Sequence, residues 1–244
     1  MKNKLPEAAP AAGAAAERRT NTPLQTLRPS KEEIALLPPY QALPLSRILL
    51  VTDASHLALA AAEVARAGMV GFDTESKPVF GAGLKSDGPH VIQIATLDHA
   101  FIFQTFRRDT LAVLQEILES PHVLKVGFGL NSDRGPLQGK LGIELQNCID
   151  VARAFRPLGF RDAVGVKTAV AIALGQRLQK SRKATTSNWA LPQLAPRQLQ
   201  YAADDAHAAL AVFMALGCPR NQPVREAKIE SAARQRTGEH DGRS

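Results

Sequence analysis

One six-residue stretch, Val70-Gly71-Phe72-Asp73-Thr74-Glu75, constrains the fold more than any other part of the chain. Its apolar start is typical of a buried β-strand, and its end carries two carboxylates. Because side chains alternate between the faces of a strand, Asp73 and Glu75 point to the same side. Two such carboxylates repel each other unless a cation lies between them, and a hard divalent cation with oxygen ligands is the usual one. The stretch therefore predicts either a metal-binding strand end or an ordinary strand end that enters solvent.

The composition is that of a globular protein with a basic charge balance. The chain has 244 residues, of which 45% are hydrophobic, enough for one large domain or two small ones. Its formal charge of +7 suits a polyanionic partner. The two cysteines, Cys148 and Cys218, exclude a disulfide framework and a zinc-ligand cluster. No segment has the pattern of a signal peptide or the length of a membrane span, so we expect a cytoplasmic protein without a membrane partner.

Proline content divides the chain into a central domain and two tails. Residues 1–44 contain seven prolines and little hydrophobic periodicity, which predicts a mostly disordered tail. Within this tail, Leu37-Pro38-Pro39-Tyr40 either docks on the domain or serves as a plain linker. We expect the folded domain over residues 45–216 and a polar C-terminal tail over residues 217–244.

Hydrophobic periodicity predicts strands and helices along the central domain. Strands are expected at residues 47–51, 69–73, 91–95, 100–103, 123–126 and 148–151, and helices at residues 55–67, 110–118, 131–139, 163–174 and 196–216. Thr52 or Ser55 is the expected N-cap of the first helix, Gly68 ends it, and residues 76–89 form a loop. The short connection at Asp98-His99 favours an antiparallel meander. Together these elements predict an α/β domain with a mixed sheet.

Further along the chain, an acid and a tyrosine–aspartate pair have patterns compatible with the same site. Asp133 follows an apolar strand and a glycine-spaced turn, where it is either a site residue or a helix-capping residue. Tyr201 and Asp205 are four residues apart and therefore share one helix face. That face is open to a metal or is an exposed polar stripe, and spacing alone does not choose between Asp204 and Asp205.

A basic segment precedes the last predicted helix and leads to the only tryptophan of the chain, Trp189. Its cations are Arg177, Lys180, Arg182 and Lys183. Cations, hydroxyls and a tryptophan in one loop are suited to holding phosphates or stacking a base. The alternative is a solvated loop in which Trp189 packs beneath the last helix, and for Trp189 we favour this packing.

Taken in order, these motifs resemble those of DEDDy-type 3′→5′ exonuclease domains, such as those of ribonuclease D and the Werner-syndrome helicase. The family's three motifs are matched by Phe72-Asp73-Thr74-Glu75, by Val126-Gly127-Phe128 through Asp133, and by Tyr201 with Asp205. The Tyr-Ala-Ala-x-Asp-Ala pattern of the third motif selects Asp205 over Asp204. The resemblance covers about residues 45–216, and the segment after Glu75 is more similar to small stand-alone members than to ribonuclease D.

The resemblance implies a ribonuclease H-like fold, with a mixed central sheet flanked by helices, and two divalent cations, Mg²⁺ or Mn²⁺, as cofactors. It also implies roles for the five residues. Asp73 bridges the two metals, Glu75 and Asp205 complete the one that holds the attacking water, and Asp133 supports the other. Tyr201 orients the water, because a phenol with a pKa of about 10 is a poor base at neutral pH.

The expected function is therefore a metal-dependent 3′→5′ exonuclease that acts on RNA or DNA with a free 3′ end, most readily single strands, by a two-metal mechanism. Weaker candidates for holding the substrate phosphates are Lys77, Lys180, Arg182 and Lys183. The alternative is a catalytically inactive nucleic-acid-binding or interaction module on the same fold. The presence of all four acids and the tyrosine favours the enzyme.

Overall fold

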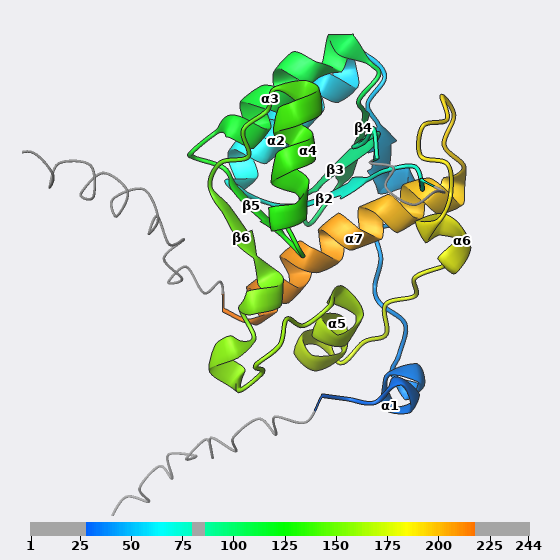
Figure 1. Ribbon diagram of the computed structural model, residues 1–244, viewed down its shortest axis with the longest axis vertical. Coiled ribbons are helices and arrows are strands. Elements are labelled where there is room, and N and C mark those ends of the chain that lie inside the picture. Colours follow the sequence, from blue (N-terminus) through cyan, green and yellow to red (C-terminus); the bar gives the residue numbers. More distant parts are fainter. Residues whose placement is uncertain (1–27, 80–85, 218–244) are drawn as a thin grey trace, which may run out of the picture.

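A mixed six-stranded sheet forms the centre of the protein in this computed structural model, which describes residues 28–79 and 86–217 (Figure 1). The strands lie in the order β1-β4-β3-β2-β5-β6. Their bounds are β1 (Ile48–Leu50), β2 (Met69–Glu75), β3 (Val91–Ala95), β4 (Ala100–Gln104), β5 (Leu124–Gly127) and β6 (Cys148–Asp150). Every predicted strand is present, and β1 lies at one edge of the sheet.

Strand pairing confirms the mixed sheet. β2, β3 and β4 form the predicted antiparallel meander, in which Glu75 pairs with Val91 and Gly71 pairs with Ala95. The other pairs, β1 with β4, β2 with β5 and β5 with β6, are parallel. β2 thus lies between an antiparallel and a parallel neighbour, and its carboxylate end extends beyond β5.

Helices cover both faces of the sheet. On one face, α2 (Ala54–Ala67), α3 (Leu111–Glu119) and α4 (Asn131–Leu141) share a buried apolar cluster with β2, β3 and β4 (Figure 1). The long α7 (Pro196–Ala215) crosses the other face, with α5 (Val166–Leu174) and the short α6 (Arg182–Thr185) beside it. Short 3₁₀ turns lie at Leu45–Arg47, Arg108–Thr110, Val151–Arg153 and Arg156–Leu158. No helix among the described residues is long and apolar enough to cross a membrane.

Close packing of α7 against β2 depends on small residues. A Cβ atom added to Gly71 would lie 1.8 Å from the carbonyl oxygen of Ala206, so the helix backbone rests directly on the strand. Ala202, Ala203 and Ala206 are fully buried at this contact. Because the two backbones approach so closely, side chains of α7 reach the carboxylates at the end of β2.

The N-cap of α2 differs from the prediction of Thr52 or Ser55. Asp53 has extended backbone angles and its Oδ1 accepts a hydrogen bond from the backbone N–H of His56 at 3.0 Å. Its other partner is the Ser55 hydroxyl, at 2.6 Å from the same oxygen. A carboxylate at this position satisfies an orphan N–H and complements the helix dipole, which explains the choice. Gly68 ends the helix with a φ of 63°, as predicted.

The prediction of disorder over residues 1–44 is wrong for residues 28–44. Ser30 and Glu33 form a reciprocal capping box that starts α1 (Lys31–Leu36). The segment that follows docks on the domain, because the Tyr40 hydroxyl lies 2.6 Å from His207 Nδ1 of α7. Main-chain bonds to Arg177 satisfy the backbone there, since Arg177 N–H donates to Pro38 and its carbonyl accepts from Tyr40. Residues 1–27, part of the predicted loop at 80–85, and the predicted tail from 218 lie outside the described residues.

Candidate active site

Three carboxylates from two elements meet at the end of β2. Asp73 and Glu75 share one face of the strand, and α7 brings Asp205 against them. Each of the three offers an oxygen, and these oxygens lie within 4.8 Å of one another. Asp205 is 4% exposed, whereas the side chain of Asp204 turns away and accepts a hydrogen bond from Gln200 at 2.8 Å. The helix geometry therefore decides the choice that residue spacing left open.

The carboxylates of this cluster resist ionising together. Burial, and then the charges of Asp205 and Glu75, raise the pKa of Asp73 well above its ordinary value. Burial followed by the charge of Asp205 raises the pKa of Glu75 to about 8. Both shifts have the same physical cause, which is negative charge confined where water is scarce. A cation at this position would reduce the repulsion between the carboxylates.

One cation of the chain already lies at the cluster. Lys180 Nζ is 2.7 Å from Asp205 Oδ2, and it also lies 5.2 Å from the centre of the Tyr201 ring. Burial acts to lower the pKa of Lys180, but the neighbouring Asp205 carboxylate raises it overall, so the ammonium stays charged. Lys180 thus partly neutralises three acids.

The donor set suits a divalent metal. Apart from the ion pair with Lys180, no well-directed hydrogen bond from the described side chains and backbone reaches the buried oxygens of Asp205, although the Tyr201 hydroxyl lies near them. Buried acceptors without donors are costly unless a cation or water serves them. Oxygen ligands from carboxylates are those that Mg²⁺ and Mn²⁺ prefer. The acidic cluster therefore fits a divalent metal.

Asp133 approaches the same strand from α4, near the opposite face. Its Oδ1 accepts a hydrogen bond of 2.6 Å from the hydroxyl of Thr74, the residue between Asp73 and Glu75. Burial raises the pKa of Asp133 to about 6. Asp133 lies outside the group of three but close enough for its charge to contribute to the raised pKa of Asp73. Sequence reasoning missed Thr74, although strand alternation places it on the α4 side.

Tyr201 belongs to α7 and lies next to the acidic cluster. Its hydroxyl accepts a hydrogen bond from Thr185 of α6 at 3.1 Å, and its ring packs 5.9 Å from that of Trp189. Burial raises the pKa of Tyr201, so the phenol stays protonated at neutral pH. Trp189 is fully buried, which confirms the prediction that it packs beneath the last helix rather than stacking a base. Thr185 is a second residue that sequence reasoning missed.

The other predicted phosphate-binding cations have different surroundings. Lys77 lies two residues beyond Glu75 in the sequence. Its Nζ forms an ion pair with Asp87 Oδ2 at 3.1 Å. Lys183 is exposed in α6, and the side chain of Arg182 lies outside the part that the structure describes. Arg177 donates to the carbonyl of Ala35 at 2.7 Å and so holds α1 in place. Among the predicted basic residues whose side chains the structure describes, the fold brings Lys180 to the carboxylates.

Comparison with known proteins agrees with this geometry. A family model described as 3′-5′ exonuclease matches residues 48–218. An Arabidopsis thaliana 3′-5′ exonuclease is 26% identical over 149 residues, which cover 60% of this chain and 52% of that protein. The chain spans about half or less of the length of the first curated relatives it matches.

Solved structures with the same fold include two nuclease domains. The EXO domain of Aedes aegypti Nibbler aligns with a TM-score of 0.60 and 26% identity, over 72% of this chain and 89% of that one. Escherichia coli ribonuclease D aligns with a TM-score of 0.60 and 22% identity, over 70% of this chain and 44% of that one, and so supports the fold alone. The fold is ribonuclease H-like, as the resemblance implied. With this sheet, this acidic cluster and a family match over residues 48–218, the chain belongs to the 3′-5′ exonuclease family.

Proposed function

We propose that this chain removes nucleotides from the 3′ end of a nucleic acid by metal-dependent hydrolysis of the phosphodiester bond. The observation that carries the proposal is the group of the buried Asp205 and the partly buried Asp73 and Glu75, whose oxygens lie within 4.8 Å of one another. Carboxylates packed so closely, with raised pKa values, cost folding energy that an ordinary structural role does not require. Binding of a divalent metal accounts for them.

Four carboxylates would hold the metals in this proposal. Asp73, Glu75 and Asp205 form the principal set, and Asp133 adds an oxygen from the α4 side. Two bound Mg²⁺ or Mn²⁺ ions would lower the pKa of a water molecule and offset the charge that develops on the phosphate oxygens. The carboxylates would fix the positions of the metals, because the backbone of α7 packs directly on β2 at Gly71.

Tyr201 and Lys180 would act on the substrate side of the cluster. Tyr201 stays protonated, so it can donate a hydrogen bond that orients the attacking water, and Thr185 holds its hydroxyl in place. Lys180 would turn from Asp205 to a phosphate oxygen when the carboxylates receive another cation. The catalytic domain in this proposal includes residues 28–44, because Tyr40 and Arg177 tie that segment to the elements that carry the site.

A time course on 5′-labelled single-stranded RNA and DNA of matched sequence tests the proposal. We expect a ladder that shortens from the 3′ end with Mg²⁺ or Mn²⁺ and disappears with EDTA. A 3′-blocked substrate should resist cleavage, which separates exonuclease from endonuclease activity. The faster substrate identifies the nucleic-acid class.

Neighbouring aspartates provide a matched pair of variants. Asp205→Asn should lower kcat by about 10³-fold or more, because it removes one ligand charge from the cluster. Asp204→Asn, one residue away on the same helix, should retain activity within a few-fold. Absence of a ladder from the unaltered protein with either metal, while it still binds the oligonucleotide, would favour the inactive binding module instead.

A further inference from the structure

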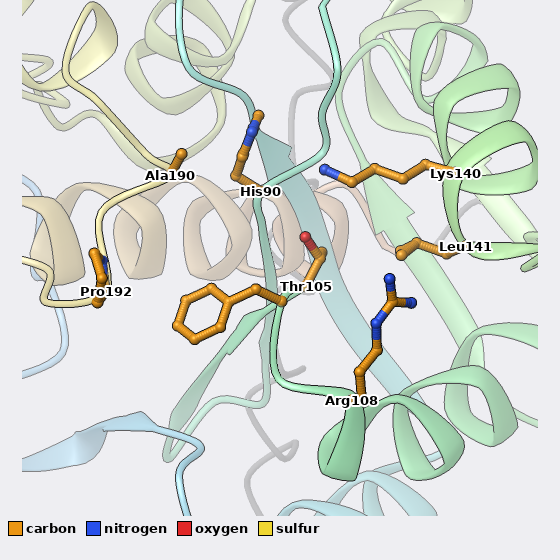
Figure 2. A pocket seen from close by; sticks show the side chains of 8 residues that line it. His90, Thr105, Arg108, Lys140, Leu141, Ala190 and Pro192 are labelled. Atoms are coloured by element: carbon orange, nitrogen blue, oxygen red, sulfur yellow. The ribbon is translucent and has the colours of Figure 1, made fainter.

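A cavity lies at the same end of the sheet as the carboxylates. It has a volume of about 320 Å³ and lies where β3 begins, β4 ends, α4 ends and the loop before α7 passes (Figure 2). Its lining residues are His90, Thr105, Phe106, Arg108, Lys140, Leu141, Ala190 and Pro192. We call it the Arg108–Lys140 pocket. Its size is at the lower end of the range for small-molecule sites and suits a group no larger than one nucleotide.

Two cations face into this pocket, and neither is held in an ion pair. Figure 2 shows the Lys140 ammonium and the Arg108 guanidinium extending from different elements toward the same space. Neither forms a hydrogen bond or an ion pair with residues 28–79 or 86–217. The nearby acid, Asp87, is already engaged by Lys77 at 3.1 Å and by His90 at 3.4 Å. The pocket therefore has a surplus of positive charge.

Electrostatics within the pocket show that these charges affect one another. Burial lowers the pKa of Lys140; the charge of Asp87 acts against this shift, and the charges of Lys77 and Arg108 add to it. Burial and the charge of Lys140 also lower the pKa of His90. Several cations held this close repel one another, and an anion placed among them would stabilise all of them. A phosphate group is the anion that Arg and Lys bind most readily in nucleic acids.

Apart from the two cations and the polar His90 and Thr105, the pocket lining is apolar and includes an exposed aromatic ring. Phe106 is 51% exposed, which is unusual for a side chain of this size. The Arg107 guanidinium lies 5.6 Å from the centre of its ring. An accessible ring beside cations that form no ion pair is an arrangement that binds single strands, since every base has a face that can stack and every nucleotide has a phosphate.

The position of the pocket connects it to the candidate active site. The backbone N–H of His90, which lines the pocket, donates to the carbonyl of Glu75 at 2.8 Å. One backbone hydrogen bond therefore joins the pocket to a residue of the acidic cluster. On α4, Asp133 lies in the first turn and Lys140 in the last. Seven residues at about 1.5 Å each separate them by about 10 Å along the helix. A strand whose 3′ end lies at the carboxylates would reach the pocket within a few nucleotides.

We propose that the Arg108–Lys140 pocket binds a nucleotide of the single-stranded substrate on the 5′ side of the scissile bond. Arg108 and Lys140 hold a backbone phosphate, and Phe106 stacks on a base. This inference rests on the proposed function, because it assigns the pocket to the same substrate. Contacts of this kind recognise backbone and ring faces, so binding is independent of sequence.

Fluorescence anisotropy with a labelled ten-nucleotide single strand in EDTA tests the subsite without catalysis. The double variant Arg108→Gln/Lys140→Gln should weaken binding on the order of tenfold at moderate salt and reduce the salt slope by about 1. Phe106→Ala should weaken binding at least fivefold. The control is Arg47→Gln/Arg66→Gln, which removes the same charge beside Asp98, away from the pocket, and should change affinity less than twofold.

Activity on two substrates separates failure of the subsite from failure of the proposed function. The pocket variants should lose kcat/KM on the ten-nucleotide strand but hydrolyse a p-nitrophenyl ester of thymidine 5′-monophosphate like the unaltered protein, because that ester has no upstream nucleotide. Equal binding by the pocket and control variants would overturn the inference. If the unaltered protein hydrolyses neither substrate, the proposed function is wrong, and the anisotropy result still decides whether the pocket binds single strands.

Discussion

Addition of one methyl group at Gly71 should move Asp205 of α7 away from Asp73 and Glu75 of β2. A Cβ at this residue would lie 1.8 Å from the carbonyl oxygen of Ala206 and 2.6 Å from its carbonyl carbon. Reaching an ordinary contact of 3.4 Å requires the helix backbone to retreat by about 1.6 Å. Backbone atoms of a long helix cannot rotate away as a side chain does. In Gly71→Ala, α7 must therefore move as a body and carry Asp205 away from Asp73.

The expected magnitudes follow from this displacement. Overpacking of a well-filled contact costs about 1–3 kcal/mol in the free energy of unfolding. Misplacement of a catalytic group by about 1 Å lowers the rate on the order of 10²-fold. We therefore expect Gly71→Ala to remain folded, but with kcat/KM lowered at least 10²-fold and with clearly weaker Mn²⁺ binding.

Denaturant unfolding, calorimetric Mn²⁺ titration and exonuclease rates measure the three quantities separately. Gly139→Ala is the matched control, because a Cβ at Gly139 of α4 would meet nothing within 4 Å. That variant should gain up to about 1 kcal/mol of stability from helix propensity. If Gly71→Ala keeps its rate and Mn²⁺ affinity within threefold of the unaltered protein, the close α7–β2 contact does not set the geometry of the site.

Three further predictions concern charge. Lys180→Gln should increase the rise in Tm caused by Mn²⁺ in thermal-shift assays, because it removes the ammonium that competes for Asp205. Mn²⁺ affinity measured by calorimetry should increase between pH 6 and pH 8, since burial raises the pKa of Glu75 to about 8 and a metal binds the ionised form; a flat profile would contradict the raised pKa. Burial lowers the pKa of Lys125 to about 8, so the folded state binds fewer protons than the unfolded state above this pH. Stability should therefore increase by about 2 kcal/mol from pH 8 to pH 9.5, and Lys125→Met should lose this increase in denaturant titrations.

Local patterns predicted most of the fold. The alternation of β2, the capping positions around Gly68 and the apolar periodicity of α7 are properties of neighbouring residues, and they act at short range. The predicted meander and mixed sheet follow from the lengths of the connections. Residues 28–44 were misjudged because their proline content suggests disorder, whereas bonds to Arg177 and His207, distant in sequence, order them.

By itself, the sequence determined the strand that presents Asp73 and Glu75, the helix that presents Tyr201 and Asp205, and the family to which these motifs belong. The tertiary structure decided how closely these carboxylates meet, because the packing at Gly71 sets the backbone of α7 directly on β2. It also decided the ion pair of Lys180, the bond from Thr74 to Asp133, and the joining of η2 (Arg108–Thr110) and α4 into one basic pocket. These contacts join residues that are far apart along the chain. Their energies depend on distance and burial, which no local pattern of residue types specifies.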